Sequence, residues 1–204
     1  MPTRTIVYID GFNLYHAIDD LGEPHLKWVN LWALSETLLK GDQQLVAVKY
    51  FSAYATWRQR SYRRHQRYVQ ALEASGVTPI LGHFKIKTVK CQAACRQTYT
   101  THEEKETDVN IGVHLMADAL ADRFDRALVV SADTDLNAAV ALTRLEAPGK
   151  QIAIVAPPGR KSRNSSALFE ITKGRIRASL LPAEMKFPDG KAIVRPVEYD
   201  PPAT

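Results

Sequence analysis

The sequence is poor in cysteine and has no long apolar run, and both shortages limit what the protein can be. Cys91 and Cys95 are the only cysteines among 204 residues, so disulfides are not the main stabilising device and a reducing, cytoplasmic compartment is expected. No apolar stretch approaches the roughly 20 residues of a membrane-spanning helix. The first apolar run, residues 6–9, is too short for a signal-peptide core. We therefore expect a soluble protein without a membrane partner.

Acidic residues are fewer than basic ones, 22 against 27, which gives a net charge of +5. This mild excess permits a polyanionic partner without requiring one, so the positions of the charges matter more than their sum. The chain is long enough for one sizeable domain with its own core. We assign residues 1–182 to that domain, with a small cysteine-containing insert around 88–103. Residues 183–204, which are interrupted by prolines, are expected to form an irregular tail.

Short β-branched or apolar runs alternate with amphipathic stretches along the chain. The runs at 5–9, 45–52, 77–87, 127–131 and 151–156 predict strands. Helices are expected between them, with Asn30, Thr56 and Thr107 as N-caps. In the helix that begins at Thr107, the apolar stripe expected to face the core is Val109, Val113, Met116 and Leu120. The alternation predicts an α/β protein of three layers, α/β/α, with a mostly parallel central sheet and right-handed crossovers.

Carboxylates follow the expected strands at one edge of the sheet. Asp10 ends the first strand, and Asp133 and Asp135 follow the apolar run at 127–131. Asp108 falls in the first turn of a helix at the same edge. Ligands of open α/β sheets bind at the carboxyl ends of the strands, so these acids are placed to hold a cation. The alternative is that Asp133 or Thr134 simply caps the next helix.

Crowded carboxylates repel one another unless a cation or a basic partner compensates. Oxygen ligands without a matching histidine or cysteine set suit Mg²⁺ or Mn²⁺ better than zinc or copper. Such an ion can activate water and stabilise the charge that develops on a phosphodiester. The acids therefore favour metal-assisted hydrolysis of a phosphodiester.

Three blocks of sequence resemble the signature blocks of the NYN domain, a PIN-like family of metal-dependent ribonucleases. They are Val-Tyr-Ile-Asp-Gly-Phe-Asn-Leu-Tyr at 7–15, Glu-Lys-Glu-Thr-Asp-Val-Asn-Ile at 104–111, and Val-Ser-Ala-Asp-Thr-Asp-Leu at 130–136. In order and spacing the resemblance covers roughly residues 4–181. It implies a Rossmann-like PIN fold, a ribonuclease activity dependent on Mg²⁺ or Mn²⁺, and single-stranded RNA as the substrate.

The resemblance also implies roles for individual residues. The metal ligands and catalytic acids would be Asp10, Asp108, Asp133 and Asp135, with Asn13 as a further catalytic polar group. Ser131 and Thr134 would support the acids without being metal ligands themselves. Glu106 stands where the family often has glycine, and two interpretations stay open: an extra acid near the metal or a solvated residue at a helix start.

Two basic segments are candidates for binding the nucleic acid. In the helix after Thr56, residues at helical spacing form a basic stripe of Arg60, Arg63, Arg64 and Arg67. The packing face is formed by Trp57, Tyr68, Val69 and Leu72. The second segment is a loop that contains Arg160, Lys161 and Arg163. Both can contact phosphates, and the alternative is a solvated basic surface with no ligand.

Some alternatives remain open. Cys91 and Cys95 have a spacing that zinc ligands use, with His83 or His102 as a third ligand, but two free thiols are favoured because no second cysteine pair exists. Two other functions compete with the ribonuclease. One is a non-catalytic RNA-binding module, and the other is a metal-dependent enzyme that acts on a small molecule in the same acidic pocket.

Overall fold

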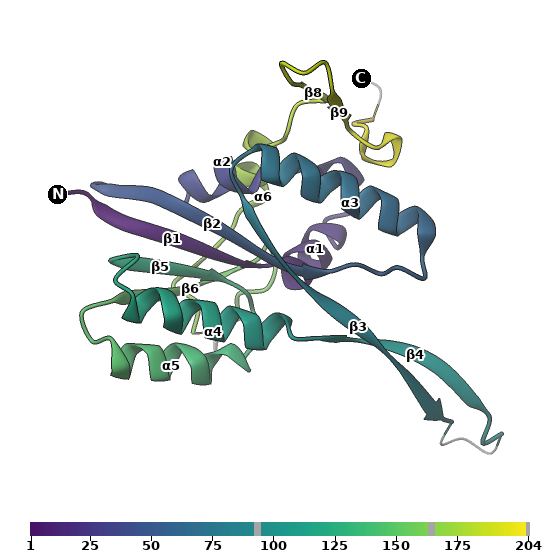
Figure 1. Cartoon of the computed structure of the whole chain (residues 1–204), viewed down its shortest axis with the longest axis horizontal. Helices are drawn as coiled ribbons and strands as arrows, with labels where there is room; N and C mark the ends of the chain where they lie inside the picture. The colour runs from purple at the N-terminus through teal and green to yellow at the C-terminus, as the bar shows by residue number, and fades with distance from the viewer. Residues whose placement is uncertain (92–94, 163–165, 203–204) are drawn as a thin grey trace.

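The computed structural model describes residues 1–91, 95–162 and 166–202 and is built on one central sheet (Figure 1). In the described ranges the strands of this sheet lie in the order β4-β3-β2-β1-β5-β6-β7. Neighbours are parallel except β3 and β4, which pair antiparallel. The strands are β1 (Thr3–Asp10), β2 (Gln43–Ala53), β3 (Thr78–Lys90), β4 (Thr98–Lys105), β5 (Arg126–Val130), β6 (Gln151–Ala156) and β7 (Phe169–Glu170).

Helices cover both faces of the sheet. Figure 1 shows α4 and α5 together on one face and α1, α2, α3 and α6 on the other. The helices are α1 (Gly11–Asp19), α2 (Leu31–Glu36), α3 (Gln59–Ala74), α4 (Thr107–Leu120), α5 (Leu136–Glu146) and α6 (Lys173–Ala178), with the 3₁₀ helices η1 (Pro24–Lys27) and η2 (Val197–Tyr199). The predicted three-layer α/β/α fold with a mostly parallel sheet is confirmed.

Strand β1 shows why both faces need helices. Its side chains alternate between two cores: Val7 and Ile9 join the core beneath α1, α2 and α3, while Ile6 and Tyr8 join the core beneath α4 and α5. The chain leaves β1 toward β2 and β3 on one side and later returns to β5 on the other. The carboxyl ends of β1 and β5 therefore meet where the strand order reverses, which is where open α/β sheets bind ligands.

Helix α4 buries a different face from the one expected. Val109, Val113 and Leu120 are 67%, 59% and 63% exposed, whereas Ile111 and Leu115 are buried. The prediction was wrong because two stripes of α4 repeat at helical spacing, and the buried one includes a polar residue, Asp118, that made it look solvated.

Two of the three expected N-caps are also wrong. Asn30 does cap α2, because its Oδ1 accepts from the backbone N–H groups of Trp32 and Ala33. Thr107 is instead the first residue of α4, and Arg58 precedes α3 in place of Thr56. A competing partner explains the shift at Thr107, whose hydroxyl donates to Glu104.

The insert predicted around 88–103 lies in the outer half of the β3–β4 ribbon, except for residues 92–94, which are outside the described ranges. Figure 1 shows the ribbon extending away from the body of the sheet. At its base a side chain at Gly82 would place Cβ 2.5 Å from the carbonyl oxygen of Lys105, so glycine is needed for the two strands to approach. The ring of Trp57 stacks on His102 at 3.6 Å between centroids and ties this base to the α3 side.

We expected the segment after residue 182 to be irregular, but part of it forms regular elements. It contains the hairpin strands β8 (Glu184–Lys186) and β9 (Ala192–Val194), followed by η2. Tyr199 of η2 is buried in a cluster with Trp28, Ala71 and Leu181. Three-residue strands between prolines are too short to give a periodic pattern, so the sequence did not reveal them. None of the helices in the described ranges is long and apolar enough to cross a membrane.

Candidate active site at the carboxyl edge of the sheet

A cleft of about 310 Å³ opens at the carboxyl ends of β1 and β5. It is lined by Asp10, Phe12, Asn13, His16, Glu104, Thr107, Asp108, Ala132, Asp133 and Arg160. The structure thus brings Asp10, Asn13, Asp108 and Asp133 together. Asp135 is exposed at the start of α5 and is outside this lining. We call this space the carboxylate cleft.

Asp10 occupies the turn from β1 into α1. Its Oδ1 accepts from the backbone N–H of Asn13 at 3.0 Å, and Ser131 Oγ donates to its Oδ2 at 2.9 Å. Gly11 makes this turn possible, because a Cβ there would lie 2.6 Å from the carbonyl oxygen of Phe51. Burial raises the pKa of Asp10 to about 6, against the lowering effect of its two hydrogen bonds and with added repulsion from Asp108 and Asp133.

Two polar side chains join the β1 turn to the loop after β5. Ser131 Oγ also accepts from the backbone N–H of Asp133 at 3.0 Å, and Asn13 Oδ1 accepts from the backbone N–H of Ala132 at 3.0 Å. Asp133 Oδ1 in turn accepts from the backbone N–H of Asp135 at 2.9 Å. Ser131 therefore contacts the carboxylate of Asp10 and the backbone of Asp133. Thr134 is exposed and is not among the residues that line the cleft.

Asp108 enters the cleft from the first turn of α4. Burial raises its pKa, and the negative charges of Asp133, Glu104 and Asp135 raise it further. Glu106, the residue before the helix, has a φ of 79° and is exposed, and its carboxylate lies 3.2 Å from His83 Nδ1. It is therefore the solvated residue at a helix start rather than a lining acid.

Glu104 lines the cleft but was not assigned a role from the sequence. Its Oε1 accepts from the backbone N–H of Thr107 at 3.2 Å and from the Thr107 hydroxyl, which holds it at the start of α4. The available signal was its position three residues before Thr107 in the second sequence block, since an acid there is placed to meet the free N–H groups of a helix start.

The donors of the cleft fit a hard divalent cation. The predicted ligands Asp10, Asp108 and Asp133 are all oxygen donors, although His16 also lines the cleft, and their mutual repulsion is what such an ion would relieve. Within the described ranges, however, no three His, Cys, Asp or Glu side chains are already arranged around one point that could hold a metal. Binding would require the exposed side chains to turn toward the buried Asp10.

The predicted nucleic-acid residues are not equally available. Arg60 and Arg64 both pair with Glu198 of the C-terminal segment, while Arg63 and Arg67 are exposed. Arg160 lines the carboxylate cleft and pairs with Asp20. In the same loop Lys161 Nζ donates to the carbonyl oxygen of Leu168 at 3.0 Å, and Arg163 lies outside the described residues.

A second, larger cavity adjoins the cleft and was missed from the sequence. Its volume is about 540 Å³, and Phe12, His16 and Glu104 line both spaces. Aromatic side chains from several separate elements form much of its wall. Because they come from distant parts of the chain with no shared spacing, no local pattern identified them.

The thiols of Cys91 and Cys95 are both free. The two histidines considered as zinc ligands have other partners, since His102 stacks on Trp57 and His83 contacts Glu106. Two free thiols therefore remain the favoured interpretation over a zinc site.

Comparison with known proteins places these features in context. The chain is 26% identical over 241 aligned positions to a protein of Pseudomonas putida named 6-hydroxy-3-succinoylpyridine 3-monooxygenase HspA, covering 97% of this chain and 76% of that protein. A crystal structure of a protein of unknown function from Vibrio parahaemolyticus has a similar fold, with a TM-score of 0.54, 16% identity, and coverage of 88% of this chain and 97% of that one. The sequence profile of the NYN domain matches residues 4–172, which include β1, β5 and all four predicted acids. The chain belongs to the NYN domain family.

Proposed function

We propose that this protein is a metal-dependent ribonuclease that hydrolyses phosphodiester bonds in the carboxylate cleft. The observation that carries the proposal is the state of Asp10, a buried carboxylate whose pKa is raised to about 6 and whose neighbours are two further acids. An uncompensated group of this kind reduces stability, so its presence is explained by the binding of a cation during function. The NYN family as a whole is associated with PIN-like nucleases, which agrees with this chemistry.

In the proposed mechanism the ion, Mg²⁺ or Mn²⁺, would be held by Asp10, Asp108 and Asp133, with Asp135 joining from the rim. When bound, it would activate water and stabilise negative charge on the phosphodiester. Asn13 and Ser131 hold the two carboxylate-bearing loops at a fixed separation through their hydrogen bonds to Ala132, Asp10 and Asp133. This preorganisation reduces the rearrangement needed when the substrate binds.

The polyanionic substrate would be held by basic groups near the cleft. Arg160 can exchange Asp20, its present partner, for a phosphate, because both sit at an exposed surface. Arg63 and Arg67 on α3 are exposed and available to more distant phosphates of a single strand. Lys161 and Arg163 in the loop after β6 remain candidates for the same role. Hydrolysis would leave a 3′-hydroxyl and a 5′-phosphate.

Cleavage of end-labelled single-stranded RNA with Mn²⁺ or Mg²⁺ tests this function. Asp133→Asn removes a charged cleft residue without changing its size, and we expect a loss of cleavage of at least about 100-fold. Glu146→Gln, at an exposed position near the end of α5, is the matched control and should cut normally. EDTA should abolish cleavage by every variant.

The competing RNA-binding module gives a different result in the same experiment. If the wild-type protein and Asp133→Asn bind a varied set of RNAs equally and neither cuts them, the acids are not catalytic. The basic surface would then be the functional part of the molecule.

An enzyme that acts on a small molecule is the second candidate, and the cavity of about 540 Å³ favours it. Its size suits a small organic ligand, and the relative from Pseudomonas putida is named for the oxygenation of a substituted pyridine. Incubation with 6-hydroxy-3-succinoylpyridine, oxygen and a chemical reductant, followed by mass spectrometry, tests it. Incorporation of one oxygen atom by the protein, in the absence of RNA cleavage, would replace the ribonuclease proposal.

A further inference from the structure

The cavity beside the carboxylate cleft has walls suited to a flat ring. Tyr50, Tyr68 and Tyr199 line it together with Phe84 and Trp57. Several of these rings already make edge contacts with one another, for example Tyr50 with Tyr68 at 6.2 Å and Trp57 with Phe84 at 4.7 Å. Rings fixed in this way offer rigid apolar surfaces, which cost little conformational entropy when a planar ligand packs against them.

The cavity lining includes the charged residues Lys27, Arg58, Arg64 and Glu104, and it also includes neutral polar groups deeper among the rings. His65 Nε2 lies 3.2 Å from the hydroxyl of Tyr50 and 3.4 Å from the hydroxyl of Ser52. Burial lowers the pKa of His65 to about 4, so the imidazole is neutral at physiological pH. Such groups can donate to or accept from a heteroaromatic ring without adding a charge.

Arg64 brings one hydrogen-bond donor that is not satisfied. Its terminal nitrogens donate to Glu198 at 3.1 Å and to Ser61 at 3.3 Å, which holds the guanidinium in place. Its Nε is buried, and no described residue accepts from it. A buried donor without an acceptor is costly, so a ligand acceptor that meets Nε when the Arg64 side chain turns toward the cavity would remove that cost.

We propose that this cavity binds one planar heteroaromatic ring through a carbonyl oxygen that accepts from Arg64, and that the ring is an unstacked base of the bound RNA. The second part rests on the proposed ribonuclease function. Phe12, His16 and Glu104 line both spaces, so a base in the cavity would belong to a nucleotide next to the phosphate in the carboxylate cleft. Stacking on aromatic side chains is a general means of holding single-stranded bases.

Binding of uridine, 2-pyridone and ribose, measured by titration calorimetry in EDTA, tests the ring site without any cleavage. Uridine carries the ring and the sugar, 2-pyridone carries only a ring with its carbonyl, and ribose has no ring. We expect uridine and 2-pyridone to bind at least about tenfold more tightly than ribose. A short oligouridylate should compete with uridine.

Two variants of α3 give a matched comparison. Arg64→Lys keeps a positive charge beside Glu198 but removes the Nε donor, and we expect it to weaken uridine binding about tenfold. Gln70→Ala, at an exposed position of the same helix that is not part of the cavity lining, should leave uridine binding unchanged. Ser52→Ala provides a second cavity variant if Arg64→Lys does not fold, and it should also weaken binding.

The possible results separate the two proposals. Binding of uridine that depends on Arg64, without RNA cleavage in Mn²⁺, supports the ring site and removes the ribonuclease. Binding of 2-pyridone with exclusion of uridine overturns the RNA base as the source and points to a free small molecule. Equal binding of uridine and ribose, or an unchanged affinity in both cavity variants, overturns the ring site, even if the protein cuts RNA.

Discussion

Two buried aspartates of this molecule have opposite surroundings. Asp118 on α4 is fully buried and accepts from Tyr8 Oη at 2.7 Å, from Lys49 Nζ and from Arg123 Nη1 at 2.8 Å. Burial by itself would raise its pKa, but these donors outweigh that effect and lower it. Asp10 is only 4% exposed, yet its partners are a backbone N–H and a hydroxyl, and its charged neighbours are acids.

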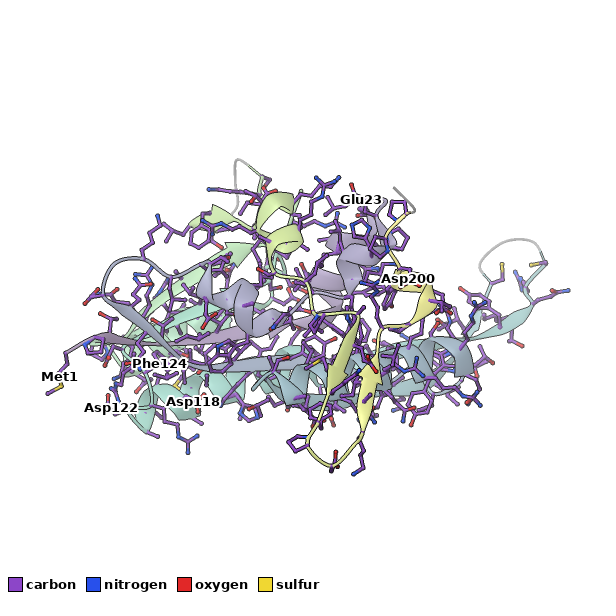
Figure 2. The ribbon with its side chains drawn as sticks, turned by 90° about the horizontal axis from the view of Figure 1, so that it is seen from above. Met1, Glu23, Asp118, Asp122, Phe124 and Asp200 are labelled. Atoms are coloured by element: carbon purple, nitrogen blue, oxygen red, sulfur yellow. The ribbon has the colours of Figure 1, made fainter. Side chains whose placement is uncertain are left out.

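The difference separates a structural carboxylate from a functional candidate. Asp118 lies toward the end of the molecule that carries Met1 (Figure 2), whereas Asp10 ends β1 at the opposite end of that strand. The fold supplies two cationic groups to Asp118, whereas none of the described hydrogen-bond partners of Asp10 is cationic. A buried acid that its own fold leaves uncompensated is best explained by a cation that comes from solution.

Removal of the charge of Asp118 should have the largest effect on stability. In Asp118→Asn the ammonium of Lys49, whose side chain is only 14% exposed, loses its anionic partner. We expect the free energy of unfolding to fall by about 3–5 kcal/mol, because one member of a buried ion pair is left behind. Urea denaturation followed by circular dichroism measures it. A decrease below about 1 kcal/mol would mean that the charge of Asp118 is no better compensated by its surroundings than the charge of Asp10.

The corresponding change at Asp10 should stabilise the protein. In EDTA at pH 7, Asp10→Asn removes a buried charge, and the difference between the ordinary pKa of about 4 and the value of about 6 corresponds to about 3 kcal/mol. The native state of the wild type binds the extra proton between these two values, so Asp10 loses its favourable contribution as the pH rises from about 4 to above 6. The advantage of the variant should therefore grow across this window.

His65 titrates in an overlapping range with the opposite sign, so only the difference between variants isolates Asp10. Its pKa is lowered by burial to about 4, and its contribution to stability is lost as the pH falls from about 6.5 to 4. Urea denaturation at several pH values, with wild type and Asp10→Asn side by side, cancels the histidine effect. An advantage of Asp10→Asn that stays constant with pH would show that Asp10 is not protonated in this window.

Binding of a divalent metal ion should remove the destabilising effect of the buried charge of Asp10. Adding Mn²⁺ at about 100 times its dissociation constant should stabilise the wild type by about 2.7 kcal/mol, because the ion binds only the native state. Asp10→Asn and Asp133→Asn should gain much less, while Glu146→Gln should gain as much as the wild type. Thermal unfolding with and without Mn²⁺ measures the effect. Equal shifts in all four proteins would place the ion elsewhere.

The sequence was sufficient for the parts of the site that depend on strand ends. Asp10 and Asp133 follow short apolar runs, and parallel strands bring such positions to one edge whatever the details of packing. It was insufficient for helix α4, since the stripe with Val109 and Val113 and the stripe with Ile111 and Leu115 have the same period. Only the burial of Asp118 with Lys49 and Tyr8, which are distant in sequence, decides between them.

Long-range pairing also explains why the basic helix was only partly understood. Arg60 and Arg64 looked equivalent to Arg63 and Arg67 because all four share a stripe of α3. Glu198, which lies more than 130 residues later, selects two of them. No local spacing could have indicated this contact, and the cavity that Arg64 lines was hidden for the same reason.

Glu198 is a carboxylate paired with cations at the surface. It provides the test with the smallest expected effect on stability. Its backbone N–H and the guanidinium groups of Arg60 and Arg64 lower its pKa to about 2. Arg60 is 80% exposed, so its pairing is screened by water, and Arg64 is 22% exposed. We expect Arg60→Ala to change the melting temperature by less than about 2 °C.

Arg64→Ala should lower the melting temperature more than Arg60→Ala, because it also removes packing against Tyr199. The guanidinium carbon of Arg64 lies 5.9 Å from the centroid of the Tyr199 ring. The lowered pKa of Glu198 means that its pairing contributes above the ordinary pKa of about 4.5 and is lost as the pH falls toward 2. The charge-dependent part of both effects should therefore vanish near pH 2, while the packing part at Arg64 remains. If Arg60→Ala were as damaging as Arg64→Ala at pH 7, exposure would not determine the value of a paired charge in this protein. The contrast between Asp10 and Asp118 would then need an explanation other than burial.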